Sequence, residues 1–533
     1  MCGFARYEVW RRRTRKIALL RQRFFHPESQ VQPEGIWISL QSHATRARDD
    51  LVQRWRAKGG GSTVDPFMSA VESARLIRTR EVSPVEVAEL YLDRIDRFNG
   101  ELNAFVWRND DHVLAAARAA EQAVIRRDEL PPFHGVPLPL KDLTAAAGQP
   151  DTRGSLGISN EPKPENELVV DAFLRAGFNL TGRTNTPELG VMTVTENRRY
   201  GITRNPWNLR YSPAGSSGGA AAAVAAGLAP IAHGNDGGGS LRMPASACGL
   251  VGLKPSRARV PQRVQSWWLY CTTDGVLTRT VRDTAAVLDC ISEPDRLSWF
   301  QAPRPERAFV DEIGRESGRL RIGLLLDAPT GQPVDPQCAV ATIQAARLLE
   351  GYGHIVEPVA PELFSGNAIR AYVETVIPAS LYTYPFEDPD LAEPYNRHRW
   401  LQAQRTHAGE YAQAARILEI ESRTVVAQWK RDFDVLLTPT MACTPPLAGT
   451  IVDEANRYPD EARPSALGMV AFTTVASISG LPAISLPVHL GPDGLPVGVQ
   501  LIGSPFDEST LLRLASALER DVAWTTRIPE NFR

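Results

Sequence analysis

The chain has no excess of charge of either sign. Its 59 lysines and arginines nearly balance 61 aspartates and glutamates, which leaves a formal net charge of -2 over 533 residues. Proteins that bind nucleic acids or anionic surfaces usually carry a basic excess or a basic patch. The composition therefore gives no reason to expect a nucleic-acid partner.

Cysteine is scarce, and long apolar runs are missing. The six cysteines are scattered without a C-x-x-C pair, which argues against a zinc site and a disulfide framework and fits reduced thiols in the cytoplasm. The nearest approach to a long apolar run, AAAAVAAGLAPIA, is interrupted by Gly227 and Pro230. Because a membrane-spanning helix needs about 18 apolar residues, no transmembrane segment is predicted.

Acidic residues are rare near the start of the chain, in ARYEVWRRRTRKIALLRQRFF, and the glycine-rich AKGGGSTVDP follows at residues 57–66. We expect residues 1–64 to form a basic, flexible extension that ends in a glycine-rich linker. The alternative is a targeting or membrane-surface helix. Residues 65–533 are then expected to form a single large domain.

Regular patterns begin after residue 66. Ser83-Pro84-Val85-Glu86 has the form of a capping box with proline at the first helical position, so a helix is predicted over residues 84–98. HGVPLPLKDL predicts a short buried strand with Lys141 at its end. The other predicted elements are a helix over 112–127, a strand and loop over 177–190, a β-α-β unit over 319–359, a helical, lid-like insertion over about 367–431, strands within 433–440 and 480–503, and a helix over 508–518. This alternation predicts an α/β fold.

Three glycine-flanked serines, Ser216, Ser217 and Ser240, lie within residues 212–246. Ser217 is the centre of a G-x-S-x-G pattern, but a nucleophile elbow requires a strand directly before it, and NPWNLRYSPA has two prolines and no β pattern. GNDGGGS lacks the G-K-[ST] ending of a phosphate-binding loop, and Arg242 replaces the last glycine of a dinucleotide fingerprint. The hydrolase elbow and both nucleotide-binding loops are therefore disfavoured.

Three glycines, Gly237, Gly238 and Gly239, come directly before Ser240. Because glycine has no side chain, their backbone N–H groups can point at an oxyanion, which favours Ser240 as a nucleophile. The alternative is a flexible glycine turn with a capping serine.

The run GSSGGAAAAVAAG…HGNDGGGSLRMPASACGLVGLKPS, residues 215–256, strongly resembles the signature region of the amidase signature family. The resemblance covers about residues 66–523 through further motifs in order: GVPLPLKDL, GRTNTPELG, YGITRNPWN, LTRTVRDTAAVLD, FDVLLTPT and SGLPAISLPV…DGLPVGVQLIG. It implies one mixed, twisted β-sheet covered by helices on both faces, in an amidase that hydrolyses a carboxylic C–N bond.

The resemblance also implies which residues are catalytic. The lysine of the K-D motif is Lys141, the first serine of G-S-S-G-G is Ser216, and the serine after the glycine turn is Ser240. A cis peptide bond before Ser216 is implied as well. The implied oxyanion hole consists of the backbone amides around Gly237, Gly238, Gly239 and Ser240.

These residue types suit a proton relay. A lysine acts as a base only when it is neutral, and a poorly solvated strand end lowers its pKa. Lys141 would take a proton from Ser216, Ser216 would take one from Ser240, and the alkoxide would form an acyl-enzyme that water releases. The alternative to a catalytic role is that Lys141 is a surface lysine paired with Asp142.

Three neighbouring residues are expected to support the site, and a fourth, His233, is expected to be structural. For Ser217, Asp236 and Arg242 a supporting role is favoured over plain helix capping by Ser217 and a structural ion pair between Arg242 and Asp236. His233 is expected to be structural, because the resemblance gives histidine no catalytic role.

The chain departs from the usual motifs of the family at two places. Ala214 replaces a glycine, and HGNDGGG places Asn235 and Gly237 where threonines often stand. Met243 occupies a position that is usually glutamine in the glutamine-hydrolysing amidotransferase A subunit, so that function is the less favoured alternative. The segments AHGND and RMPAS have more sequence similarity to bacterial amidases that resemble the 6-aminohexanoate cyclic-dimer hydrolase. A catalytically silent, amidase-like binding protein is the non-enzyme alternative.

An aromatic cluster, Trp267, Trp268 and Tyr270, follows the signature region. It is predicted to line the substrate pocket and to favour hydrophobic or aromatic amides, anilides or esters, and core packing is the alternative. Cyclic amides are a further substrate alternative. No cofactor and no metal are expected, and the expected partners are a small-molecule amide and a second copy in a homodimer.

Overall fold

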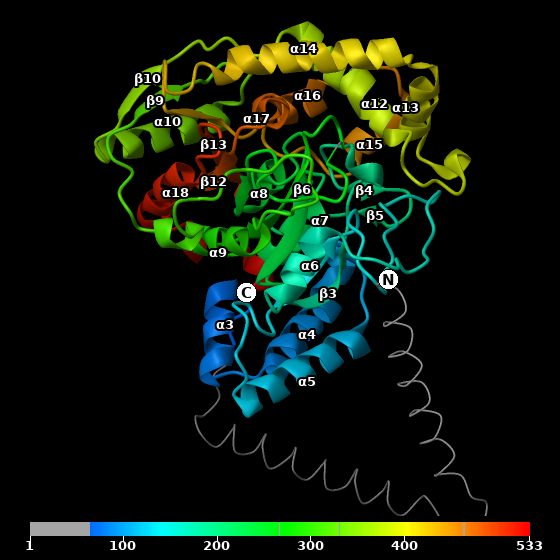
Figure 1. Ribbon diagram of the computed structural model, residues 1–533, viewed down its shortest axis with the longest axis vertical. Coiled ribbons are helices and arrows are strands. Elements are labelled where there is room, and N and C mark those ends of the chain that lie inside the picture. Colours follow the sequence, from blue (N-terminus) through cyan, green and yellow to red (C-terminus); the bar gives the residue numbers. More distant parts are fainter. Residues whose placement is uncertain (1–63, 266, 330, 462–463) are drawn as a thin grey trace, which may run out of the picture. The chain divides into compact units, whose positions relative to one another are not determined.

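An eight-stranded mixed sheet forms the centre of the computed structural model, which describes residues 64–265, 267–329, 331–461 and 464–533 (Figure 1). Strands β9, β10 and β11 run parallel to one another, and the other neighbours in the sheet are antiparallel. The strand order is β10 (Ile355–Pro358), β9 (Arg321–Leu324), β11 (Val435–Pro439), β13 (Pro496–Ile502), β12 (Ala483–Leu490), β7 (Val251–Lys254), β8 (Thr273–Thr278) and β6 (Ile231–Asp236).

The predicted N-terminal extension, residues 1–64, lies outside the described residues except for Val64. From Val64 to Arg533 the described chain is one compact unit. Within it, no helix has the combination of length and apolarity that crossing a membrane requires.

A second sheet of three strands lies beside β6, the last strand of the large sheet. Its order is β1 (Phe105–Trp107), β3 (Asn179–Thr184) and β2 (Pro137–Lys141). All five residues of β2 are buried, so the predicted strand is confirmed and Lys141 is its last residue. Lys141 therefore enters the protein interior from the smaller sheet rather than from the eight-stranded one. A short pair, β4 (Glu196–Asn197) and β5 (Gly201–Ile202), completes the strands of the described chain.

Helices cover both faces of the large sheet, as the resemblance implies. Helices α7 (Gly218–Ala225) and α8 (Arg242–Cys248) pack on strands β6, β7, β12 and β13 from one face. The other face is covered by α9 (Val281–Ile291), α10 (Pro336–Gly351) and α18 (Glu508–Val522). Helix α7 consists of two glycines, five alanines and a valine, all of them buried. These residues are small because the helix backbone packs closely against neighbouring segments of the protein. A Cβ atom at Gly219 would lie 2.4 Å from the backbone nitrogen of Asn185.

The amino-terminal helices are α3 (Ala70–Thr79), α4 (Pro84–Leu102), α5 (Asp110–Arg126) and α6 (Leu168–Arg175). The predicted capping box is confirmed, since the Ser83 hydroxyl accepts from the N–H of Val85 and the Glu86 carboxylate accepts from the N–H of Ser83. The helix predicted to end near residue 98 continues to Leu102. The helix ends there because Asn103 adopts a left-handed conformation, with φ 52°. Gly100 has no such conformation, so the helix continues past it.

The segment predicted to be helical over about 367–431 contains α11 (Gly366–Arg370), a π-helical turn η3 (Ala371–Val376), α12 (Ile377–Leu381), η4 (Pro389–Leu391), α13 (Pro394–Arg405) and α14 (Ala408–Val426). Helix α14 packs against η3 and against α17 (Thr473–Ser479), which precedes β12. Two more helices, α15 (Thr450–Arg457) and α16 (Pro464–Val470), lie between β11 and α17.

The last residues of the chain are part of the core. Phe532 is fully buried and packs edge-on against Phe98, with ring centroids 5.2 Å apart. Its backbone oxygen accepts a hydrogen bond of 2.6 Å from the Arg94 guanidinium. The same apolar cluster contains Ala222 and Ala223 of α7.

Candidate active site

Lys141 ends β2 in a fully buried position, where its Nζ has three close partners. Nζ lies 2.7 Å from Ser216 Oγ, 3.1 Å from Ser217 Oγ and 2.7 Å from Asn235 Oδ1. The Asn235 oxygen can only accept a hydrogen bond. The Ser217 hydroxyl donates to the Asn235 backbone oxygen, at 3.2 Å, so its oxygen accepts from Lys141. A neutral lysine has two N–H groups for these two acceptors, which leaves its lone pair for the Ser216 hydroxyl.

Burial lowers the pKa of Lys141 to about 7, although the negative charges of Asp236 and Asp274 oppose that shift. An ammonium loses its hydration in the interior, so the neutral amine is favoured. The neutral, basic form of Lys141 is therefore accessible near neutral pH. The surface alternative for Lys141 is wrong, because the side chain is fully buried.

The segment that holds Ser216 and Ser217 begins with a cis peptide bond between Gly215 and Ser216, as the resemblance implies. Ser217 precedes α7, but its side chain makes no capping hydrogen bond, so the helix-capping alternative is wrong. The N–H of Ser217 donates to the backbone oxygen of Ser240, at 3.3 Å, and links the two serine segments.

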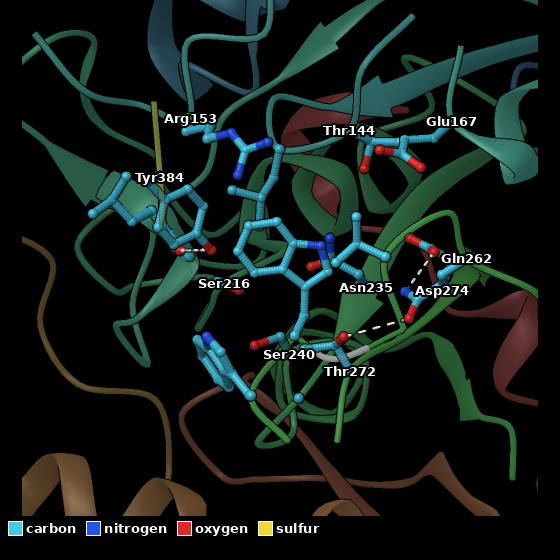
Figure 2. Close-up of a pocket in the computed structure, with 17 residues that line it drawn as sticks. Thr144, Arg153, Glu167, Ser216, Asn235, Ser240, Gln262, Thr272, Asp274 and Tyr384 are labelled. Carbon is cyan, nitrogen blue, oxygen red and sulfur yellow. Dashed lines mark hydrogen bonds between the residues drawn. The ribbon is translucent and has the colours of Figure 1, made fainter. Parts of the chain in front are cut away.

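Ser216 and Ser240 line the same cavity (Figure 2). Ser240 is 7% exposed and Ser216 is 1% exposed, so Ser240 is the more accessible of the two. No hydrogen bond joins their hydroxyl oxygens in the described structure. Hydrogen bonds of a catalytic relay often tighten only when substrate binds, so the shared cavity is the relevant geometry of the free protein.

Asp236 is bound to Arg242 in a fully buried ion pair of 2.8 Å, which is the pairing predicted as the alternative to a supporting role. Burial raises the pKa of Asp236, but the Arg242 guanidinium outweighs it and holds the pKa below its usual value. Arg242 is anchored in turn by Gln500 Oε1 at 2.6 Å and Ser477 Oγ at 2.9 Å. The pair stabilises the turn between β6 and α8.

One of the four amides predicted for the oxyanion hole is engaged elsewhere. The N–H of Gly239 donates to Asp236 Oδ1 at 2.8 Å, which corrects the expectation that this amide faces the substrate. The N–H groups of Gly237, Gly238 and Ser240 have no acceptor among the described residues. These three amides are the donors that the turn leaves free.

His233 has a structural position in β6. Its Nδ1 lies 3.3 Å from the backbone N–H of Lys141 and accepts from it, so Nε2 carries the hydrogen and donates to Asp274 Oδ1 at 3.2 Å. The imidazole thus connects the end of β2 to β8 and does not contact either serine hydroxyl.

The cavity is narrow: the space open to a water-sized sphere is about 80 Å³, less than the roughly 300–1,000 Å³ of typical small-molecule sites. Trp267 and Trp268 line it, as predicted. Arg153, Glu167 and Tyr384 also line it and were missed, because they come from segments without a recognisable motif. Figure 2 shows Arg153 and Glu167 across the cavity from Ser240.

Tyr270 lies on a different cavity, which corrects its assignment to the substrate pocket. Trp268, Leu269 and Tyr270 have positive φ angles of 47°, 53° and 62°, so the chain turns left-handed and sends Tyr270 away from Trp268. The Tyr270 ring packs edge-on against Phe300, with centroids 5.1 Å apart, and lines that second cavity with Leu418.

A metal centre has no evident ligand set. Over the described ranges, no group of three or more histidine, cysteine, aspartate or glutamate side chains is arranged to hold a metal ion.

Known proteins share both the sequence and the fold of this chain. The amidase family matches residues 86–512. The 6-aminohexanoate-cyclic-dimer hydrolase of Paenarthrobacter ureafaciens is 35% identical over 492 residues, which cover 88% of this chain and 98% of that protein. The acylamidase of Rhodococcus erythropolis is 32% identical over 486 residues, 87% of this chain and 97% of that one.

Solved structures agree with the sequence comparison. A 6-aminohexanoate cyclic dimer hydrolase complexed with substrate superimposes with a TM-score of 0.81 at 33% identity, covering 88% of this chain and 100% of that one. A bacterial aryl acylamidase gives a TM-score of 0.78 at 27% identity, covering 86% and 97%. Relatives that are hydrolases of C–N bonds thus extend over nearly all of the described residues. The chain belongs to the amidase family and is a hydrolase of the amidase class.

Proposed function

We propose that Ser240 is the nucleophile of this amidase, that Ser216 relays the proton and that Lys141 is the base. The observation that supports this proposal most is the 2.7 Å contact between Lys141 Nζ and Ser216 Oγ in a buried site that lowers the pKa of the lysine to about 7. A neutral amine next to a hydroxyl is the arrangement that general-base activation of a serine needs.

In the acylation step, the Ser240 oxygen bonds to the amide carbon while its proton passes to Ser216 and the Ser216 proton passes to Lys141. The carbonyl oxygen becomes an oxyanion, which the free amides of the glycine turn can stabilise. The proton then returns from Lys141 through Ser216 to the amide nitrogen, and the C–N bond breaks. Water adds to the acyl carbon by the same relay, the Ser240 ester bond breaks, and the acid leaves.

The substrate is proposed to be a hydrophobic or aromatic amide, anilide or ester. Trp267 and Trp268 supply apolar surface next to Ser240, and Arg153 stacks on the rings of Tyr384 and Trp267 at 4.6 and 5.7 Å. Because one relative is named a cyclic-dimer hydrolase and one solved structure an aryl acylamidase, cyclic and aryl amides are the first substrates to test.

Ser217, Asp236 and Arg242 are proposed to support the reaction without taking part in bond changes. The proposal also includes the helical segment over 367–431 as a cover of the site, a homodimer, and a reducing compartment such as the cytoplasm. Free thiols at all five described cysteines support the last point.

Labelling with a fluorophosphonate probe tests the proposal. The probe should form one adduct on the wild type and none on Ser240→Ala. Ser422→Ala is the matched control, because Ser422 lines the second cavity. An adduct on Ser240→Ala would assign the nucleophile to another residue. No adduct on the wild type would favour a catalytically silent protein. A screen of aryl, cyclic and short aliphatic amides then identifies the substrate class.

A further inference from the structure

Each carbonyl of the glycine turn has its own hydrogen-bond donor. The Gly237 oxygen accepts from the Tyr372 hydroxyl at 2.6 Å, and the Gly238 oxygen accepts from the Thr473 hydroxyl at 2.6 Å. The Gly239 oxygen accepts from the N–H of Met243 at 2.7 Å. The three carbonyls are thus held by three different elements, η3, α17 and α8.

In a trans peptide unit, the C=O of one residue and the N–H of the next point in opposite directions. The bond from Tyr372 to the Gly237 oxygen therefore sets the direction of the Gly238 N–H, away from the buried tyrosine. The bond from Thr473 sets the direction of the Gly239 N–H, which Asp236 already holds. Tyr372 is accordingly the side chain that orients a free amide of the turn.

Packing alone does not fix Gly238. A Cβ atom at Gly237 would lie 2.8 Å from the Trp268 ring, and one at Gly239 would lie 2.4 Å from Thr473 Oγ1, so both positions are tightly confined. A Cβ atom at Gly238 would have no neighbour within 4 Å. The orientation of the peptide between Gly237 and Gly238 therefore depends on the hydrogen bond from Tyr372 more than on contacts.

Tyr372 is itself rigidly placed. It is 2% exposed, lies in the π-helical turn η3 and packs edge-on against Trp268, with ring centroids 6.4 Å apart. Burial raises the pKa of the Tyr372 phenol well above its usual value, so the hydroxyl stays protonated and remains a donor.

We infer that Tyr372 is a positioning residue of the oxyanion hole: its hydroxyl holds the Gly237 carbonyl and thereby aims the Gly238 N–H at the developing oxyanion. The inference rests on the proposed function of Ser240. Through Tyr372, the helical segment that follows Gly366 contributes to catalysis without contacting substrate.

The expected kinetic effect is specific. Removing an oxyanion donor outright lowers kcat by about 100- to 1,000-fold. Tyr372→Phe only loosens one donor, so we expect kcat to fall about 10-fold while KM changes less than about 2-fold, because the oxyanion forms after substrate binds. The rate constant for phosphonylation of Ser240 by a fluorophosphonate should fall by the same factor, since that reaction also builds negative charge on oxygen.

Tyr91→Phe is the matched control. The Tyr91 hydroxyl also donates to a backbone oxygen, that of Pro66 at 3.2 Å, and the side chain is 1% exposed. Tyr91 lies in a hydrophobic cluster that does not contain Tyr372. Both variants should lose a similar amount of thermal stability, and only Tyr372→Phe should lose rate. Tyr372→Met, which also lacks the hydroxyl, replaces Tyr372→Phe if the latter does not fold.

Equal phosphonylation rates for Tyr372→Phe and Tyr91→Phe would overturn the inference, as would a change confined to KM. If the wild type reacts through Ser240 and these variants do not differ, the positioning role fails and the proposed function stands. If the wild type does not react at Ser240, the proposed function itself fails.

Discussion

Lys141 and Ser216 are 75 residues apart in the chain, and Lys141 Nζ lies 2.7 Å from Ser216 Oγ. The contact joins the end of β2 in the small sheet to the loop before α7. Burial favours the neutral, basic form of this lysine. The same burial of an ionisable group lowers the free energy of unfolding. Two measurable consequences follow from that pairing.

The rate of amide hydrolysis should rise as the pH passes about 7, because the neutral form of Lys141 is the active base and burial lowers the pKa of Lys141 to about 7. A pH profile of kcat/KM checks this, with an ionisation expected near that value. Lys141→Met should remove the ionisation together with most of the activity. An unchanged profile in that variant would assign the ionisation to another group.

The stability of the fold should depend on the same group. The unfolded chain has a lysine pKa near the ordinary 10.5, while the folded protein has about 7, so between these values the unfolded state binds the extra proton. The free energy of unfolding therefore rises with pH across this window, and below it the full cost of the buried charge remains. Lys141→Met should be more stable than the wild type at pH 6.5, and the difference should shrink by pH 9. Urea unfolding at both pH values tests this, and an equal difference at both would contradict it.

Asn235 accepts one of the two N–H groups of neutral Lys141. Asn235→Leu removes the acceptor, so the lysine lone pair is no longer directed at Ser216, and kcat should fall about 10-fold, the equivalent of one hydrogen bond. Asn235→Thr restores a short acceptor at this position and should recover part of the loss. A wild-type rate in Asn235→Leu would show that the acceptor is not needed.

Breaking the buried ion pair should affect the fold strongly. Asp236→Asn leaves the Arg242 charge unpaired in the interior, where such a loss costs about 3–5 kcal/mol. Asp453→Asn is the control, because its pair with Arg457 also measures 2.8 Å but the two side chains are 65% and 62% exposed. The control should cost about 0.5 kcal/mol or less by chemical denaturation. Comparable losses in the two variants would contradict the structural role of the pair.

Substrate preference should depend on Trp267 and not on Tyr270. Trp267→Ala removes an aromatic wall of the cavity, so activity on aryl amides should fall relative to activity on short aliphatic amides. Tyr270→Ala changes only the second cavity and should leave that ratio unaltered. Ratios of kcat/KM for a matched aryl and aliphatic pair measure the effect, and an unchanged ratio in Trp267→Ala would refute the pocket assignment.

Much of this fold could be predicted from local pattern. The capping box before α4, the apolar strand that ends at Lys141 and the β-α-β unit of β9, α10 and β10 depend on neighbouring residues, and all are present. The resemblance to the family added the mixed sheet with helices on both faces and the choice among the three serines. The predicted end of α4 near residue 98 was wrong, because the left-handed residue that ends the helix is Asn103.

The rest of the site depends on contacts between distant segments. Tyr372 reaches Gly237 across 135 positions, a contact that motif spacing does not constrain. The hydrogen bond that occupies the Gly239 amide depends on the rotamer of Asp236, and the direction of Tyr270 depends on three successive positive φ angles. Such features follow from the packed tertiary structure, since no local propensity distinguishes these residues from their neighbours.

The buried Phe532 side chain supports the helix that follows the proposed catalytic serine segment. Phe532 packs in the same cluster as Ala222 and Ala223, and these alanines belong to the helix that starts directly after Ser217. A Phe532→Ala substitution would therefore loosen the support of the serine loop, although Phe532 is more than 300 positions from Ser217 in the chain.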